Sequence, residues 1–254
     1  MKKKKSQTKS SPSVYLIGDH ALVEEFAASC QAAGFRVAGK LNPRDRGLTL
    51  PTYVSKRASP PADALLAVEL TNSDPQVKKK NLQWLDKQLK PSKGLLTSSV
   101  TVTASEQATW IKRRDRLVGM SALPTLISGK LVELAASAYT AKKSVLDASE
   151  FFFKLGKQVC VTQDRIGMVM PRILCMLINE ACFALAENIA SPDSIDTAMK
   201  LGTNYPLGPI EWANRIGIQA VHDVLSALQS DLSEERYRIA PLLKQLAMMP
   251  RKGT

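Results

Sequence analysis

The sequence predicts a two-domain protein, in which an α/β domain with a mostly parallel sheet is followed by an all-helical domain. Between residues 13 and 163, short apolar runs alternate with amphipathic segments of helical period, a pattern typical of a parallel sheet covered on both faces. Between residues 164 and 254, apolar residues recur at three- and four-residue spacing, which indicates amphipathic helices. A chain of 254 residues is long enough for two domains that each bury a core.

The first region begins with the pattern of half a dinucleotide-binding fold. Segment 14–18 is an apolar run that ends in glycine, 21–33 has helical spacing, and 35–41 is a second apolar run. Segment 41–63 is rich in proline, arginine and threonine and has no clear periodicity. Further strands are predicted at 64–70, 94–99 and 158–162, and further helices at 75–89, 104–111 and 140–155.

The second region begins with a long helix, predicted from about 169 to 188. The next helix is expected to begin at Pro192, because Ser191 can cap its free amides and proline already has a helical φ. Gly202 is expected to end it. A proline- and glycine-rich turn at 205–209 then leads into further helical segments.

Composition limits the class of protein. The chain is 44% hydrophobic and 23% charged, which is ordinary for a globular protein, and no apolar run approaches the roughly 20 residues of a membrane span. Residues 1–12 are basic and polar, which predicts a disordered tail and a cytoplasmic protein. The four cysteines lack the spacing of zinc ligands, so reduced thiols and no metal site are expected.

The net charge of +12 favours an anionic partner without identifying it. Basic clusters at 78–80 and 112–114 would suit nucleic acid, but no stacking or groove-entering motif accompanies them. Nucleic acid is therefore an unlikely partner by this criterion. Attraction of a polyanionic small molecule and simple solvation of helix faces explain the charge equally well.

Three motifs in the helical region carry a resemblance to a known family. They are Asp164, Gly167, Arg172 and Asn179-Glu180-Ala181 in the first, Asp196–Gly202 in the second, and Tyr205–Pro209 in the third. In this order they resemble the C-terminal helical domain of the 3-hydroxyacyl-CoA dehydrogenases, oxidoreductases of fatty-acid metabolism. The resemblance implies a truncated Rossmann-like domain at 13–163, a helical domain at 164–254, NAD as cofactor, an acyl-CoA ligand and a homodimer formed through the helical domain.

The glycine fingerprint of dinucleotide-binding folds is incomplete in this chain. Against G-x-G-x-x-G, the run 18–23 keeps Gly18 but has His20 and Val23 at the other two glycine positions, and Asp19 stands where a diphosphate should lie. Leu41 and Asn42 occupy the place of the acid that would hold a ribose hydroxyl. The candidate cofactor-binding residues are Gly18, Asp19, His20 and Glu69. We expect NAD to bind weakly or not at all.

The family's proton acceptor is a histidine in a G-x-H-F-F-N-P run. The matching run at 119–124 has Ser121 at the histidine position, and the K-L-V-E run at 130–133 supports this register. Glu133 matches the glutamate that orients the histidine. A serine without an adjacent histidine or lysine cannot act as a base near neutral pH.

Two further positions complete the candidate catalytic set. Thr101 matches a hydroxyl residue of the family's S-N-T-S run, and Pro171 matches the asparagine that precedes the arginine of the long helix. Proline carries no polar side chain, so that substrate contact is expected to be lost. The two histidines of the chain, His20 and His222, match no catalytic role.

Three functions remain open at this point. The first is a catalytically impaired family member that binds an acyl-CoA-like ligand or a partner. The second is an active NAD-dependent 3-hydroxyacyl-CoA, or 3-hydroxybutyryl-CoA, dehydrogenase with an unusual proton acceptor. The third, nucleic-acid association, is the least favoured.

Dimer formation is also expected from the long helix, which is apolar around much of its circumference. The apolar residues outside its main stripe are Met168, Met170, Cys175, Met176 and Phe183. The alternative is that these residues are buried against the chain's own first domain.

Overall fold

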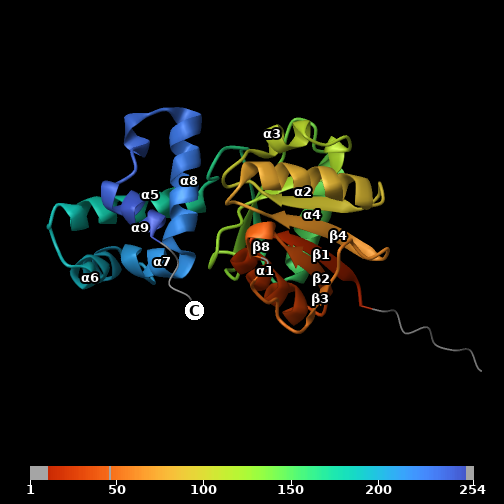
Figure 1. Cartoon of the computed structure of the whole chain (residues 1–254), viewed down its shortest axis with the longest axis horizontal. Helices are drawn as coiled ribbons and strands as arrows, with labels where there is room; N and C mark the ends of the chain where they lie inside the picture. The colour runs from red at the N-terminus through yellow and green to blue at the C-terminus, as the bar shows by residue number, and fades with distance from the viewer. Residues whose placement is uncertain (1–10, 46, 250–254) are drawn as a thin grey trace, which may run out of the picture.

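The computed structural model describes residues 11–45 and 47–249. Along the chain, a domain with a single sheet is followed by a group of helices (Figure 1). The strands are β1 (Ser13–Gly18), β2 (Arg36–Leu41), β3 (Val54–Lys56), β4 (Ala64–Leu70), β5 (Gly94–Ser98), β6 (Leu117–Met120), β7 (Leu131–Ala135) and β8 (Gln158–Thr162). The helices are α1 (His20–Ala32), α2 (Pro75–Gln88), α3 (Ala104–Thr109), α4 (Lys142–Lys154), α5 (Met170–Ala186), α6 (Pro192–Thr203), α7 (Pro209–Ile216), α8 (Ile218–Leu232) and α9 (Pro241–Met248).

The sheet has the order β3-β2-β1-β4-β5-β6-β7-β8. All neighbouring strands are parallel except β6 and β7, which are antiparallel. Strands β2 and β3 lie on one side of β1, and β4 and the later strands lie on its other side. The strand order therefore reverses between β1 and β4. In an open α/β sheet, ligands bind in the crevice beyond the carboxyl ends of the strands at such a point.

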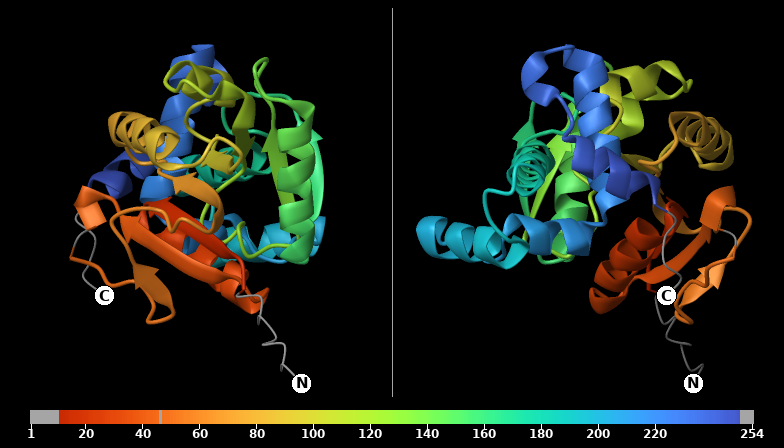
Figure 2. Two further views of the ribbon diagram at one scale, coloured as in Figure 1. Left: turned by 90° about the vertical axis from the view of Figure 1, so that its right-hand side faces the viewer. Right: turned by 60° about the vertical axis from the view of Figure 1, so that its left-hand side comes forward.

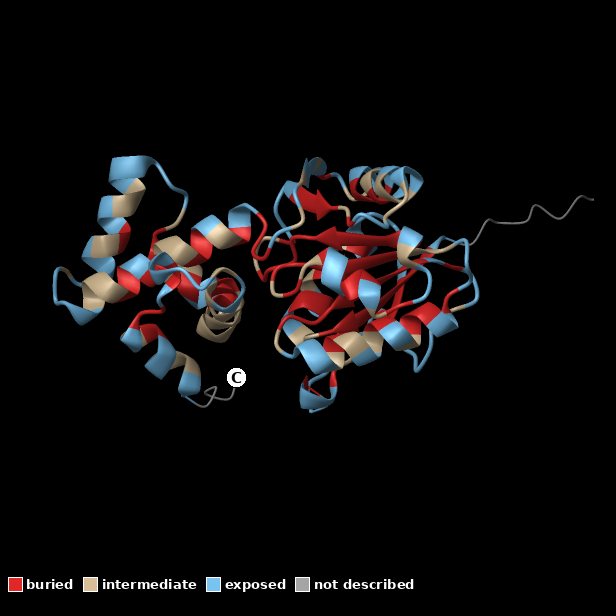
Figure 3. Cartoon of the chain, turned by 90° about the horizontal axis from the view of Figure 1, so that it is seen from above, coloured by how far each residue is buried: buried red, intermediate tan, exposed pale blue. Residues whose placement is uncertain are grey.

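Helices cover both faces of the sheet (Figures 1 and 2). On one face, Phe26 of α1 and Phe151 of α4 pack against strand residues such as Leu16. On the other face, Leu82 and Leu85 of α2 contribute to a second core. Figure 3 shows that the buried residues are concentrated in the strands and on the helix sides that face them. The Rossmann-like fold predicted from sequence is confirmed.

Several details differ from the sequence prediction. Strands β6 and β7 lie in segments where no strand was predicted. Segment 41–63, in which no element was predicted, contains the short edge strand β3 and a 3-10 turn at Pro43–Asp45. The second helix of the helical region, α6, continues past Gly202 to Thr203, and Asn204 ends it with a left-handed φ of 57°. Asparagine adopts this conformation more readily than most residues, so it can replace glycine at a helix end.

The family-like motifs of the helical region supply side chains that hold neighbouring elements together. We call each such contact a joint. The Asp164 carboxylate accepts hydrogen bonds from the N–H groups of Ala104 (2.8 Å) and Ser105 (2.7 Å), at the start of α3. The amide side chain of Asn179 donates to the carbonyl of Arg238 and accepts from the N–H of Ala240, both at 2.9 Å. These contacts attach α3 and the segment before α9 to neighbouring elements.

A third joint connects the two remaining motifs. Asp196 of α6 accepts hydrogen bonds from the N–H groups of Ile210 (2.8 Å) and Glu211 (3.0 Å) in the first turn of α7. Gly208 lies against the same carboxylate, and a Cβ at this position would overlap it. Glycine is therefore required here by the close approach of α6 and α7.

The structure corrects the residues expected to form a dimer surface. Met168 and Cys175 are buried, and Met176 and Phe183 pack against the core of the helical region. Only Met170 of the five is exposed, at 44%. Cys175, Met176 and Phe183 thus pack within the core of the helical region, whereas Met168 is buried outside that core.

Other expectations concern termini and surface. The basic tail predicted at 1–12 falls mostly outside the described residues, which begin at 11. Cys30, Cys175 and Cys182 are buried free thiols, whereas Cys160 is exposed on β8. None of the helices that the structure describes is long and apolar enough to cross a membrane.

Candidate functional site

Ser121 and Glu133 lie side by side where β6 and β7 pair. The Ser121 N–H donates to the Glu133 carbonyl (3.0 Å), and the Ser121 hydroxyl oxygen accepts from the Glu133 N–H (3.1 Å). Both residues are buried, with exposures of 9% and 3%. The serine hydroxyl is therefore part of the strand pairing, and its oxygen already receives a hydrogen bond.

The carboxylate of Glu133 points to the helical region. Its two oxygens accept hydrogen bonds from the N–H groups of Val169 (2.8 Å) and Met170 (2.7 Å), at the start of α5. The first N–H groups of a helix have no partner within the helix, and the helix dipole favours a negative charge there. Glu133 thus caps α5 and joins the sheet to the helical region, a role that the sequence did not reveal.

Thr101 and Pro171 border the same region. The Thr101 hydroxyl donates to the backbone carbonyl of Asn72 (3.3 Å), and the Asn72 side chain donates to the carbonyl of Ala122 (2.7 Å). Pro171 is buried in the first turn of α5, where a missing N–H costs little. Thr101 is thus linked through Asn72 to Ala122, the neighbour of Ser121, and Pro171 directly follows Met170, whose N–H bonds Glu133. None of the four candidate positions provides a free base.

Glu69 lies in a different place from the one expected for a cofactor contact. It is fully buried in β4, and the Nζ atom of Lys78 lies 2.5 Å from its Oε2. Its other oxygen accepts from the Thr71 N–H (3.1 Å). Lys78 is equally buried and also donates to the Ser98 carbonyl (2.9 Å). This ion pair is internal, so Glu69 is enclosed by protein groups.

The turn after β1 holds Gly18 and Asp19 at the crevice of the sheet. A Cβ at position 18 would overlap the backbone of Leu70 at the end of β4, which explains the retained glycine. The Asp19 carboxylate accepts four hydrogen bonds. They come from the Asn42 side chain (2.9 Å), the Asn72 N–H (2.8 Å), the Ser73 N–H (3.1 Å) and the Ser73 hydroxyl (2.8 Å).

The start of α1 is also occupied. The N–H of His20 donates to the carboxylate of Asp45 (2.9 Å), and the His20 ring lies 2.9 Å from the Thr49 carbonyl oxygen. Val23, at the third glycine position, is fully buried in the core. Sequence reasoning missed Asp45, because 25 residues separate it from His20 and no motif marks it.

Comparison with known proteins identifies the family. The description "3-hydroxyacyl-CoA dehydrogenase, NAD binding domain" matches residues 22–165, and "3-hydroxyacyl-CoA dehydrogenase, C-terminal domain" matches residues 167–254. The chain belongs to the 3-hydroxyacyl-CoA dehydrogenase family. The resemblance seen in the helical motifs is confirmed, and it extends over both domains.

Several relatives carry dehydrogenase names. A 3-hydroxybutyryl-CoA dehydrogenase of Bradyrhizobium diazoefficiens is 35% identical over 184 residues, covering 72% of this chain and 62% of that protein. A 3-hydroxybutyryl-CoA dehydrogenase of Clostridioides difficile is 30% identical over 75% of this chain and 68% of its own length. The crystal structure of (S)-3-hydroxybutyryl-CoA dehydrogenase from Ralstonia eutropha has the same fold, with a TM-score of 0.76, 24% identity and 93% coverage of both chains. The sequence match thus spans about three fifths of the Bradyrhizobium protein and two thirds of the Clostridioides protein.

NAD is the cofactor that this family implies. The residues at the dinucleotide turn of this member do not fit its diphosphate. In the described conformation, the Asp45 carboxylate takes the His20 N–H, and Asp19 fills the crevice between β1 and β4. A diphosphate at the start of α1 would need the N–H groups there, including that of His20, and it would lie close to the carboxylates of Asp19 and Asp45.

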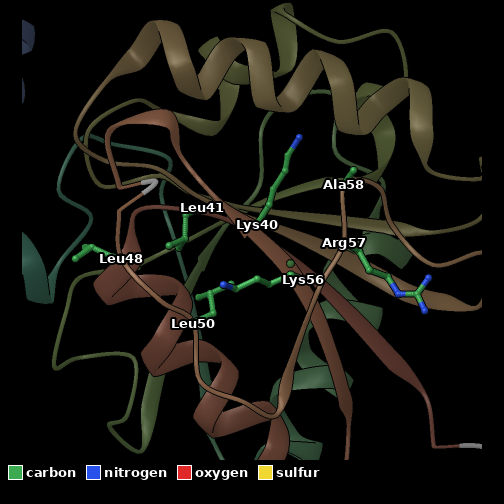
Figure 4. Close-up of a pocket in the computed structure, with 8 residues that line it drawn as sticks. Lys40, Leu41, Leu48, Leu50, Lys56, Arg57 and Ala58 are labelled. Atoms are coloured by element: carbon green, nitrogen blue, oxygen red, sulfur yellow. The ribbon is translucent and has the colours of Figure 1, made fainter.

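A pocket beside this turn does not provide an alternative anion site (Figure 4). It has a volume of about 320 Å³ and lies at the β2–β3 edge of the sheet. Three cationic residues, Lys40, Lys56 and Arg57, contribute to its lining. The Lys40 ammonium lies 3.7 Å from the ring centre of Trp84 in α2, and Figure 4 shows Arg57 pointing away from Lys56. The three charges do not converge on one point.

The helical region faces the turn with Asp223 of α8, whose side chain is only 18% exposed. Burial raises the pKa of this carboxyl above its ordinary value, and the negative charge of Asp19 adds to the rise. A hydrogen bond from Gln219 and the charges of His222 and Arg44 oppose it. The ionised form of Asp223 is therefore less stable in the folded protein than in the unfolded chain.

We expect Asp223→Asn to stabilise the protein at neutral pH, by an amount on the order of 1 kcal/mol. The native pKa of Asp223 is raised, so its favourable contribution exists below the unfolded pKa of 3.8 and is lost as pH rises through the folded value. Asparagine can still accept the hydrogen bond from Gln219 and carries no charge. Thermal unfolding at pH 7 and near pH 3 should show a difference between variant and wild type only at the higher pH. An equal difference at both pH values would exclude the electrostatic explanation.

Proposed function

We propose that this chain is a catalytically impaired member of the 3-hydroxyacyl-CoA dehydrogenase family, which acts by binding an acyl-CoA-like ligand or a partner in the cytoplasm. The observation that carries the proposal is the position of the Glu133 carboxylate. Both of its oxygens are used by the N–H groups at the start of α5, and Ser121 stands at the histidine position. No described side chain at these positions can accept the hydroxyl proton when hydride leaves.

Apolar surface beside Glu133 supports binding of an acyl group. Leu131 on β7 and Val169 at the start of α5 are both 49% exposed, and Ile173 of α5 is 51% exposed. Val169 donates its N–H to Glu133, and Leu131 lies two residues before Glu133 on β7. Exposed aliphatic side chains of this kind suit a ligand with a hydrocarbon portion. The net charge of +12 would attract the phosphate groups of a coenzyme A thioester.

The alternative is an active NAD-dependent 3-hydroxyacyl-CoA dehydrogenase with an unusual proton acceptor. The names of its relatives, at 35% and 30% identity, favour this function. A direct assay separates the two. NADH oxidation with acetoacetyl-CoA should be roughly 10² to 10⁴-fold slower than with a relative that has the histidine, because general acid–base catalysis contributes that factor. Turnover within tenfold of the relative would refute the impaired function.

Binding should be measured on the same samples. Calorimetric titration with acetoacetyl-CoA in the absence of NADH tests the ligand part of the proposal independently of catalysis. Binding without turnover supports an impaired, ligand-binding protein. Absence of both would exclude the acyl-CoA ligand and leave a protein partner as the remaining form of the proposal.

We also propose that the protein forms a homodimer through its helical region. Helix α6 has 12 residues but buries only Asp196, and it lies at the end of the helical region farthest from the sheet (Figure 1). Ile189 before it is 69% exposed, and Leu201 within it is 83% exposed. An amphipathic helix usually gains its stability by packing, so a second copy covering α6 accounts for these exposed apolar side chains.

We expect Leu201→Glu to convert the dimer to a monomer, since a charge replacing a central apolar contact weakens an interface by about 2 kcal/mol or more. Light scattering coupled to gel filtration measures the change. Leu146→Glu is the matched control, because Leu146 is 68% exposed on α4 in the other region and should leave the dimer intact. A wild-type protein that is monomeric at micromolar concentration would contradict the dimer.

A further inference from the structure

Two carboxylates meet at the carboxyl ends of β1, β2 and β4, the position that a dinucleotide would use. Asp19 follows β1, and its hydrogen-bond donors Asn42 and Asn72-Ser73 follow β2 and β4. It therefore links the ends of three strands across the crevice where the strand order reverses. The network is internal, since Asn42 is 3% and Asn72 6% exposed.

Asp45 completes the closure at the start of α1. Asp45 is 7% exposed, and its carboxylate accepts from the His20 N–H, the first amide of the helix. Asp19, the N-cap residue, makes no side-chain hydrogen bond to this helix. Asp45 thus supplies a carboxylate to the first N–H at the positive end of α1. The His20 ring lies against the Thr49 carbonyl and so attaches this segment to the same point.

We propose that Asp45 is a resident anion, which takes the place of a ligand phosphate at the start of α1 and closes the dinucleotide site from within. A carboxylate and a phosphate compete for the same helix end, because both are stabilised by its free N–H groups and its dipole. Val23 reinforces the closure, because it fills the space that the third glycine leaves for close helix–strand packing. This inference does not depend on the missing base at Ser121.

Occupation of the helix end has two consequences. The site is built without any cofactor, so the stability of α1 does not require NAD. A dinucleotide would have to displace Asp45 and bring its own negative charge close to Asp19, which adds repulsion to the loss of the hydrogen bond. Wild-type protein should show no enhancement of NADH fluorescence at millimolar NADH.

The decisive experiment removes the resident anion and supplies another. We expect Asp45→Ala to lower Tm by about 2–4 °C, the size of a lost helix cap in a protein of this length. Inorganic pyrophosphate at millimolar concentration should restore most of that Tm, because it can occupy the vacated helix end. Asp45→Asn keeps an acceptor oxygen without the charge, so its Tm should lie between those of wild type and Asp45→Ala.

Asp74→Ala provides the matched control. Asp74 caps α2 by accepting from the N–H groups of Gln76 (2.8 Å) and Val77 (3.1 Å), but it is exposed on the surface. Its loss should lower Tm without specific rescue by pyrophosphate. The proposal is overturned by submillimolar NADH binding to wild type, by an unchanged Tm in Asp45→Ala, or by pyrophosphate stabilising wild type and Asp45→Ala equally. NADH binding without turnover in the acetoacetyl-CoA assay would refute only the closed site, whereas turnover, which requires bound NADH, would refute both the closed site and the impaired function.

Discussion

Lys78→Met should destabilise the protein by roughly 3–5 kcal/mol, because it leaves the Glu69 carboxylate buried without its cation. Both side chains are completely buried, and the distance between Lys78 Nζ and Glu69 Oε2 is 2.5 Å. The loss also removes the donor to the Ser98 carbonyl. Such an amount is a large part of the 5–15 kcal/mol that stabilises a typical domain. Urea unfolding followed by circular dichroism measures it.

A double variant distinguishes the buried charge from the lost packing. Lys78→Met combined with Glu69→Gln removes both charges and keeps an acceptor for the Thr71 N–H. We expect it to recover most of the stability lost in Lys78→Met, since replacing both members of a buried pair costs less than breaking it. If the double variant is as unstable as the single one, packing of the lysine chain is the cause, and the ion pair contributes little.

Glu133→Ala is expected to lower the unfolding free energy by roughly 2–4 kcal/mol, even though the residue occupies a catalytic position of the family. Two hydrogen bonds to a charged group are lost, and the N–H groups of Val169 and Met170 remain without an acceptor. The favourable charge at the positive end of α5 is lost as well. A residue that only orients a catalytic histidine would have little effect on stability.

The comparison with Asp74→Ala defines the scale of this effect. Both residues are carboxylates that accept two N–H groups at the start of a helix, but Glu133 is 3% exposed and Asp74 is a surface residue. The exposed cap should cost about 1 kcal/mol. Equal losses for the two variants would show that burial adds nothing at Glu133 and would weaken its role as the connection between sheet and helices.

The sequence predicted most helices and strands because the spacing of apolar residues depends only on neighbouring positions in the chain. The run from β1 to β2 and the long helix α5 both follow directly from apolar spacing. Strands β3, β6 and β7 were missed; β3 has three residues and β6 four, which are too few to show a period. The reversed direction of β7 could not be predicted, because a strand's composition does not encode which way it runs beside its neighbour.

The site was predicted only in part. The resemblance brought Ser121 and Glu133 together, and the structure pairs them through backbone contacts. The direction of the Glu133 carboxylate depends on where the helical region lies, 36 residues further along the chain. The contact of Asp45 with His20 spans 25 residues, which include helix α1 and strand β2. Such contacts arise from tertiary packing, which neither period nor motif describes.

The joint between Asp196 and Gly208 has a consequence for how proteins of this kind are classified. The aspartate belongs to one of the recognisable motifs and the glycine to another, yet both serve a single helix-to-helix contact. Substitution of either residue would disturb this contact whether or not the protein is an enzyme. A protein can therefore change its catalytic residues and still keep these motifs. The motifs then show which family the protein descends from, but they do not show which reaction it catalyses.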